Sequence, residues 1–582
     1  MDYIFYNMSS IIGDKNKSVT SKNPQLQEAE TGQSVLVRDN KIHAVGSYQL
    51  LKKISSNPQL IDLQGNVLLP AFTDAHTHFV ETAKQMLTLN VLGCQNDDEF
   101  YQRLIEYREK INKRINKGEQ IKPSWIKGFG WEKRVLDKYP NINKNLIDKV
   151  FPDIPVSIAS RDLHSNLCNS KALDVINSAN SEYNKKSSVI NQAISNQNLK
   201  NIDNIEGVVL GKFANGELNG FLYENSWTLL DRYIPPIDDD LLKKLLKELI
   251  VKSYKYGLCG VHSMEDRKSA EIVKNVCEEM KFYFTWYYLQ MANDKSKDEN
   301  IISSEIKPIS NVEQPFKHKN YHFLEETQYF RNGGIKLFTD GSLGSDTAWM
   351  FGKKTVSHSD LEVLSLQYKD YMNEIKNKII EAHLQDIQVA IHAIGDYAVY
   401  ATTKVLKAIN QQYGSRVKHR IEHLQAVRPQ DIKLLIEANI HASMQSIHIK
   451  EDEELIKKKW LIARDYAFPL KSVSEAVEMA LGSDSPVETL NPFEGLKYAV
   501  SNHKTEGNQG INKEKMQIFN ALDSYTFKHH IIANKPVIYG KIEEGQRANI
   551  IVVKKEIFDD LWKFDNYEVE MTMLDGDIVW EK

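Results

Sequence analysis

Eight short apolar runs recur along the middle of the chain, and longer stretches with helical spacing separate most of them. The runs are residues 67–73, 257–263, 282–289, 333–339, 388–393, 420–424, 440–446 and 479–484. Between 239 and 256 the leucines recur every three or four positions, which is typical of an amphipathic helix. Strand followed by helix, repeated, predicts an α/β fold, a TIM-like (β/α)8 barrel with a closed parallel sheet.

Both ends of the chain show strand patterns instead. Residues 34–46 predict a hairpin around Asp39-Asn40, and 545–555 and 571–582 predict further strands, with a turn at Asp575-Gly576. We therefore expect a small β-sandwich domain built from both termini, residues 1–66 and 531–582.

A long insertion separates the first two apolar runs. It spans residues 93–235 and contains strand-like runs of its own at 125–131 and 155–160. This leaves residues 67–92 and 236–530 for the barrel. Because the insertion directly follows the first barrel strand, we expect it to cover the active site at the barrel rim and to set specificity.

Composition narrows the classes of partner. The chain has 582 residues, of which 41% are hydrophobic and 26% charged, the balance of a globular protein. A net charge of −4 gives no electrostatic reason to expect nucleic acid or an anionic membrane as a partner. The four cysteines are scattered, and no apolar stretch is long enough to span a bilayer. We expect a cytoplasmic protein that acts on a small molecule, with homo-oligomer formation left open.

Metal-binding residue types gather at the ends of the apolar runs. His76 and His78 follow the first run and, two positions apart on a strand, point to the same face. His392, His423 and Asp484 end three later runs. Because the carboxyl ends of barrel strands converge on one rim, these distant residues can share one site. Imidazoles with carboxylates favour Zn²⁺, with Mn²⁺, Fe²⁺ or Co²⁺ as alternatives.

Lys336 lies within an apolar run, where a charged amine is costly to bury. Two interpretations stay open. The neutral amine reacts with carbon dioxide to give a carbamate that bridges two cations, or the ammonium forms a salt bridge with a carboxylate such as Asp340. A site with a single ion and an unmodified Lys336 is a further alternative.

Five motifs stand in order along the chain: LLPAFTDAHTHF (68–79), GGIKLFTDGSLGSDTA (333–348), IHAIGD (391–396), RIEHLQ (420–425) and GSDSPVETLNPF (482–493). Together they resemble the metal-dependent amidohydrolase superfamily, and more closely its YtcJ-like branch, which includes N-substituted formamide deformylase. The resemblance covers essentially the whole chain. It implies that His76 and His78 hold one metal and His392 and His423 a second. It also implies that Lys336 bridges both as a carboxylated side chain and that Asp484 is ligand and general base.

The predicted activity is hydrolysis of a non-peptide C–N bond, in an amide or formamide-like substrate, by attack of a metal-bound hydroxide. His164, Glu224, Asp340 and His448 are candidate contacts to the substrate. Because a scaffold does not specify its substrate, deaminase, lactonase and phosphoesterase reactions stay open. So does a non-catalytic binding protein that kept the metal site.

Overall fold

The structure is a computed structural model, and the part of the chain that it describes falls into two compact units. The first joins Met1–Thr82 to Leu246–Lys582, and the second is Ala83–Leu245. The described residues are 1–11, 33–116, 124–131, 138–160, 165–176, 208–224, 234–289, 321, 323–344, 347–351, 358–500, 514–559, 561–563 and 565–582.

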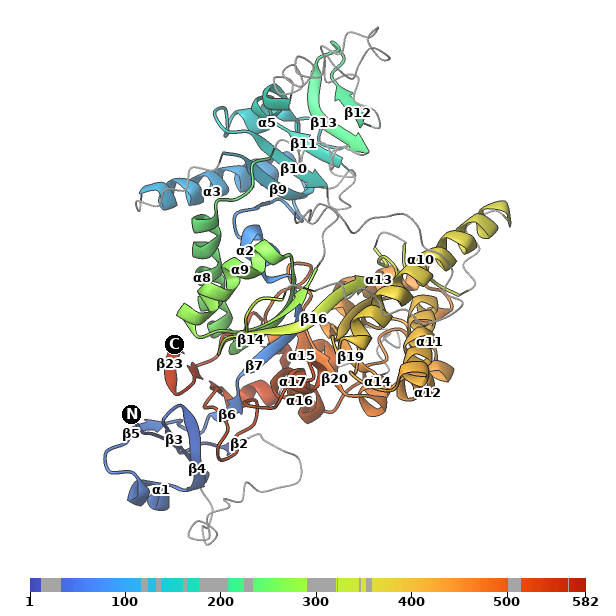
Figure 1. Cartoon of the computed structure of the whole chain (residues 1–582). Coiled ribbons are helices and arrows are strands. Elements are labelled where there is room, and N and C mark those ends of the chain that lie inside the picture. Colours follow the sequence, from blue (N-terminus) through green and yellow to red (C-terminus); the bar gives the residue numbers. More distant parts are fainter. Residues whose placement is uncertain are drawn as a thin grey trace. The chain divides into compact units, whose positions relative to one another are not determined.

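One parallel sheet of eight strands forms the centre of the first unit (Figure 1). Its strands are β7 (Phe72–Thr77), β14 (Leu258–Glu265), β15 (Tyr283–Tyr288), β16 (Phe330–Phe338), β17 (Val389–Ala393), β18 (Arg420–His423), β19 (His441–Met444) and β20 (Met479–Leu481). Strands adjacent in sequence are adjacent in the sheet, and a bridge between Thr77 and Ser485 joins its two edges. All eight predicted runs contribute a strand, and the predicted TIM-like barrel is confirmed.

Helices follow most of the barrel strands. They are α2 (Phe79–Gln85), α8 (Asp239–Lys255), α9 (Arg267–Met280), α10 (His358–Leu384), α11 (Asp396–Tyr413), α12 (Ile432–Glu437), α13 (Ile449–Lys459), α14 (Leu470–Ala476), α15 (Pro492–Val500), α16 (Ile518–Thr526) and α17 (Lys528–Ile532). Side-chain hydrogen bonds to backbone amides fix where some of these helices begin. Asp266, for example, caps α9 by accepting the backbone N–H of Ser269 at 2.9 Å. Among the described residues, no helix combines the length and the apolar character needed to cross a bilayer.

The first apolar run, residues 67–73, divides between two sheets. β6 (Val67–Pro70) pairs with β21 (Ile550–Val553) in a sheet formed by the two chain ends, and barrel strand β7 begins only at Phe72. At the junction, the N–H of Ala71 donates to the carbonyl of Asn549 at 2.9 Å. An unbroken apolar run cannot reveal this transition, because both sheets bury these residues.

The chain ends form two small sheets with a shared core, close together in Figure 1 as the blue and red segments. One sheet contains β1 (Tyr3–Tyr6), β3 (Gln33–Arg38), β4 (Lys41–Ser47) and β5 (Gln59–Asp62), with α1 (Tyr48–Ile54) following β4; the other contains β2 (Ser10–Ile11), β6, β21, β22 (Met571–Leu574) and β23 (Asp577–Glu581). Fully buried Phe5, Val35, Leu68, Ile550 and Met573 belong to the shared core. The two ends of the chain thus build the predicted sandwich.

The second unit has a sheet and a core of its own. Its strands and helices are β8 (Leu89–Asn90), β9 (Ile126–Trp131), β10 (Val156–Ser160), β11 (Ser165–Cys168), β12 (Val208–Lys212), β13 (Leu218–Glu224), α3 (Asp97–Asn116) and α5 (Lys144–Asp148). Phe100, Leu104, Phe151 and Val156 are buried in its largest apolar cluster. The strands expected at 125–131 and 155–160 are β9 and β10. That this unit covers the barrel rim stays a prediction.

Candidate metal centre

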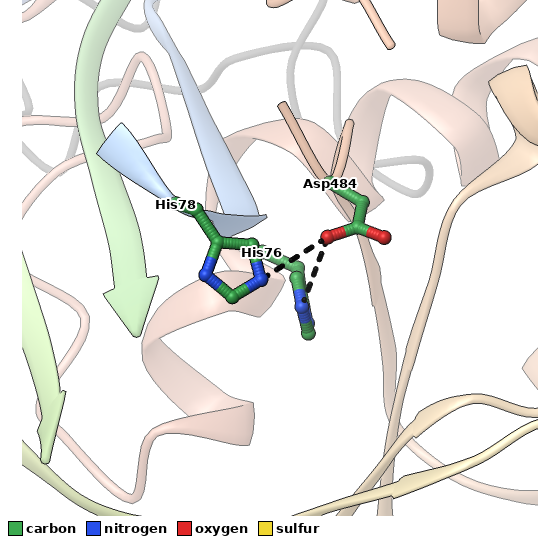
Figure 2. A group of neighbouring side chains, drawn as sticks. All are labelled: His76, His78 and Asp484. Atoms are coloured by element: carbon green, nitrogen blue, oxygen red, sulfur yellow. Dashed lines mark ion pairs between the residues drawn. The ribbon is translucent and has the colours of Figure 1, made fainter. Parts of the chain in front are cut away.

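The carboxyl ends of the first and last barrel strands bring His76, His78 and Asp484 together. His76 lies in β7, His78 directly follows that strand, and Asp484 follows β20. Both imidazoles face the Asp484 carboxylate in Figure 2, with Nε2 of each ring 3.5 Å from Oδ1. The N–H of Asp484 also donates to the carbonyl of His76 at 2.8 Å, which holds the two strand ends in register.

A second group of ligand-type residues shares Asp484. Nε2 of His448 lies 3.3 Å from Oδ2 of Asp484, and His448 belongs to the short 3-10 helix η4 (Ser446–His448) after β19. His423, at the end of β18, completes this group. Ligand atoms of His76, His78 and Asp484 lie within 4.8 Å of one another, and so do those of His423, His448 and Asp484. One carboxylate therefore joins two histidine pairs.

His392 of β17 and Lys336 of β16 lie next to these two groups. The ring centres of His392 and His423 are 4.4 Å apart. Nε2 of His392 donates to the carbonyl of Gly341 at 3.0 Å, so the lone pair of the neutral ring is on Nδ1. Lys336 is buried, with Nζ 3.5 Å from Nε2 of His76. The predicted ligands thus lie in one region. His448, predicted only as a substrate contact, also lies there, beside the Asp484 carboxylate.

Asp340 interacts with backbone amides and does not pair with Lys336. Its carboxylate accepts the N–H groups of Ile394 and Trp349 at 3.0 Å and of Gly395 at 2.9 Å. The structure describes both residues and shows no ion pair between them, so Asp340 is not the carboxylate partner of Lys336. A contact between Asp340 and substrate stays a prediction.

The other two predicted substrate contacts belong to the insertion. His164 lies outside the described residues. Glu224 is the last residue of β13, and its backbone pairs with that of Val208. Substrate contacts by either side chain stay predictions.

Burial keeps most imidazoles of the cluster neutral, although at His448 the hydrogen bond to the Asp484 carboxylate outweighs it and raises the pKa. Burial lowers the pKa of His76 and of His392 to about 4 and holds that of His423 well below its usual range. Burial also lowers the pKa of Lys336 to about 8. A neutral imidazole has one lone pair to offer, which is the form that binds metals.

The cluster fits divalent cations. Imidazole nitrogens together with a carboxylate are ligands that Zn²⁺ takes, and Mn²⁺, Fe²⁺ and Co²⁺ accept them too. Nδ1 of His423 is buried and has no hydrogen-bond partner among the described residues. A buried nitrogen without a partner is costly, and coordination would satisfy it. The described residues therefore suit the divalent metal predicted from the sequence.

The sequence analysis missed a buried ion pair beneath this cluster. Arg420 and Glu422, both on β18, are fully buried, and Nη2 of Arg420 donates to Oε2 of Glu422 at 2.8 Å. The same oxygen lies 2.5 Å from Nδ1 of His76. Because Glu422 binds Nδ1, the ring of His76 is fixed with Nε2 facing Asp484. Two charged residues within the buried run RIEH were the available signal.

Two of the candidate ligands have left-handed backbone conformations. The φ angles of His423 and Asp484 are +74° and +58°, and Leu424 follows at +45°. This region costs a residue with a side chain about 1–3 kcal/mol and is enriched at functional sites. The strain lies at the strand ends where His423 and Asp484 reach the cluster.

Gly482 lies where the first and last strands meet, and Gly482→Ala is expected to destabilise the protein by about 1–3 kcal/mol. A Cβ atom there would lie 2.5 Å from the backbone nitrogen of His76 and 2.7 Å from Oδ1 of Asp74, so the strands would have to separate. Thermal unfolding followed by circular dichroism measures the change. Gly344→Ala is the control, since the nearest atom to its Cβ among the described residues would be the hydroxyl of Ser342 at 3.9 Å. Equal melting temperatures for both variants would contradict tight packing at Gly482.

Comparison with known proteins gives matches that run almost end to end. A model of the amidohydrolase family matches residues 59–580. The putative amidohydrolase YtcJ of Bacillus subtilis is 26% identical over 572 residues, which cover 96% of this chain and 97% of that protein. An N-substituted formamide deformylase of Arthrobacter pascens is 22% identical over 567 residues, covering 94% and 95% of the two chains.

A solved structure supports the same fold. An uncharacterised metal-dependent hydrolase from Pyrococcus horikoshii OT3 superimposes with a TM-score of 0.66 at 20% identity, over 95% of this chain and 98% of its own. At that identity the likeness concerns the fold.

Proposed function

The chain is a hydrolase of the amidohydrolase family, and on this premise we propose that it cleaves a non-peptide C–N bond in an amide or formamide-like substrate. The observation that carries the proposal is Asp484, whose carboxylate contacts imidazoles of both histidine groups. The similarity to a protein named N-substituted formamide deformylase supports the formamide class.

Asp484 would serve as a ligand and as the group that moves the proton. One oxygen faces His76 and His78, and the other faces His448, so binding and proton transfer can use different oxygens. A divalent cation held here would lower the pKa of a bound water to about 7 and polarise a carbonyl group. Asp484 would accept a proton from the attacking water and deliver it to the departing nitrogen. The leaving group is then an amine.

Lys336 would complete the site as a carbamate. Its neutral amine adds to carbon dioxide, a C–N bond forms and one proton is released, which leaves an anionic group with two oxygens. The position of Nζ, 3.5 Å from Nε2 of His76, supports the addition of oxygen ligands beside that histidine.

A substrate panel tests the reaction class. Metal-loaded protein is incubated with N-substituted formamides, small amides, lactones, aminopyrimidines and phosphate esters, and released amine, ammonia, acid or phosphate is quantified. Release of an amine from formamides or amides is the expected result. Turnover confined to lactones, phosphate esters or aminopyrimidines would reject the proposed bond, and no turnover by fully metal-loaded protein would favour a binding protein.

Metal content tests the bridging role of Lys336. Protein purified without chelators in bicarbonate buffer is expected to hold about two divalent ions per chain, because a bridged pair needs ligands for both. Lys336→Ala should reduce this towards one or none, as measured by inductively coupled plasma mass spectrometry. Lys497→Ala is the matched control, since Lys497 is also buried but pairs with Glu494 and Asp565. An unchanged metal content in Lys336→Ala would contradict the bridge.

A further inference from the structure

Three aromatic side chains gather beside the carboxyl end of β16, next to the metal-binding residues. Phe338 is the last residue of β16, Tyr371 lies on α10, and Trp349 lies in the segment between these two elements. The hydroxyl of Tyr371 donates to the carbonyl of Phe338 at 2.8 Å. The ring centres of Tyr371 and Trp349 are 6.1 Å apart. We call these three residues the aromatic cluster.

The ring of Phe338 faces the metal centre. Phe338 pairs with His392 in the register of β16 and β17, and residues paired in this way point to the same face of a sheet. The ring centres of the two residues are 5.4 Å apart. Lys336, two positions earlier on the strand, shares that face, and its Nζ lies 5.2 Å from the centre of the Phe338 ring. Phe338 therefore lies one step nearer the barrel mouth than Lys336.

The aromatic cluster presents apolar surface to solvent at this mouth. Phe338 is 38% exposed and Tyr371 is 40% exposed, whereas Lys336 is only 4% exposed. Single apolar residues are common on protein surfaces, but neighbouring exposed rings beside a candidate site are typical of ligand-binding surfaces. A substrate that reaches the metal-binding residues at the strand ends comes close to the Phe338 ring.

Hydrogen bonds hold Phe338 in place. Beyond it, the N–H of Thr339 donates to the carbonyl of His392 at 2.9 Å, so the pairing of β16 with β17 continues past the aromatic residue. The hydroxyl of Tyr371 fixes the carbonyl of Phe338 from the other side. A surface that is already ordered binds an apolar group without a further entropic cost.

We propose that Phe338 determines specificity by contacting an apolar substituent on the nitrogen of the substrate. This inference rests on the proposed cleavage of a formamide-like C–N bond. A formamide carries only hydrogen on its carbonyl carbon, so every larger group is on its nitrogen. With the carbonyl group at the metal-binding residues, that substituent lies in the space around them, and Phe338 is an exposed apolar side chain next to both Lys336 and His392.

Steady-state kinetics of the metal-loaded chain with matched formamides test the proposal. N-methylformamide, N-hexylformamide and N-phenethylformamide share the bond to be broken and differ only in the apolar substituent. Phe338→Ala should lower kcat/KM about tenfold for the two larger compounds, because it removes an apolar contact, and change it by less than about twofold for N-methylformamide. Phe519→Ala is the matched control, since Phe519 is 46% exposed on α16 and should leave all three values unchanged.

Two kinetic outcomes would overturn the proposal. Equal losses for all three compounds would mean that Phe338→Ala damages the metal centre. Unchanged values for the hexyl and phenethyl compounds would mean that the substituent binds elsewhere.

A binding measurement separates this proposal from the proposed reaction. If the metal-loaded wild type hydrolyses none of the compounds, the reaction fails, and the Kd of each compound is measured instead by calorimetric titration. A Kd that rises about tenfold in Phe338→Ala for the two larger compounds alone would still support the contact. Equal Kd values for the two proteins, or no binding to either, would overturn it.

Discussion

Replacing Glu422 with alanine is expected to lower the free energy of unfolding by about 3–5 kcal/mol, because the variant leaves the guanidinium of Arg420 buried without its carboxylate. Both side chains are fully buried. The remaining partners of Arg420 are the carbonyl of Ala75 at 2.7 Å, Nδ1 of His262 at 3.0 Å and the hydroxyl of Tyr287 at 3.1 Å, and none of them carries a negative charge. Urea unfolding of the metal-free protein, followed by far-ultraviolet circular dichroism, measures the loss.

Two further variants make the result interpretable. Glu422→Gln keeps a hydrogen-bonding group between Arg420 and His76 and should lose less stability than Glu422→Ala. Its weaker hydrogen bond to His76 should reduce metal affinity about 10–100-fold, as measured in competition with a chelator. Glu271→Ala is the surface control, since Glu271 forms an exposed pair with Arg267 and such pairs contribute little. If Glu422→Ala were no more destabilising than Glu271→Ala, the buried pair would have no structural role.

Asp484→Asn is expected to reduce kcat by about 10²–10⁴-fold, the range that a positioned general base contributes. Burial raises the pKa of Asp484, but the hydrogen bond with His448 and the nearby imidazoles outweigh it and hold the pKa well below its usual range. The group is therefore ionised at neutral pH and able to accept a proton. Asparagine has the same shape and keeps one oxygen as a ligand. Initial rates of amine release, normalised to bound metal, measure the effect.

Asp386→Asn provides the matched control for charge. Asp386 lies on the surface of the same unit, where it pairs with Arg416 at 2.9 Å, and its variant should retain the wild-type rate. A rate within tenfold of wild type for Asp484→Asn with full metal content would exclude Asp484 as the general base. A loss of metal in proportion to the loss of rate would instead assign it a ligand role alone.

The barrel was predictable because a parallel strand buried on both faces is a continuous apolar run, and all eight runs became strands. Periodicity also placed the helix from Asp239, which ends at Lys255. The resemblance to the amidohydrolase superfamily is confirmed by the family match. The division of residues 67–73 between β6 and β7 was not predictable, since nothing in an apolar run marks a change of sheet.

The candidate site was predictable where it depends on strand ends, and less so where it depends on turns. The carboxyl ends of parallel strands meet at one rim, so His76 and Asp484 could be expected together. The 3.3 Å separation of His448 from Asp484 depends on the short helix η4, which has no periodic signal. The Arg420–Glu422 pair is not predicted for another reason, because the metal-binding pattern in the RIEH motif points only to His423.

The junction of the first and last barrel strands, β7 and β20, also affects when the metal site can form during synthesis of the chain. His76 and His78 leave the ribosome roughly 400 residues before Asp484, a delay of about 20–80 s at usual elongation rates. During that interval the histidine pair has neither its carboxylate nor the neighbouring strand that closes the barrel. High-affinity metal uptake must therefore follow translation of almost the whole chain, and nascent chains that stop before Asp484 should not retain the metal.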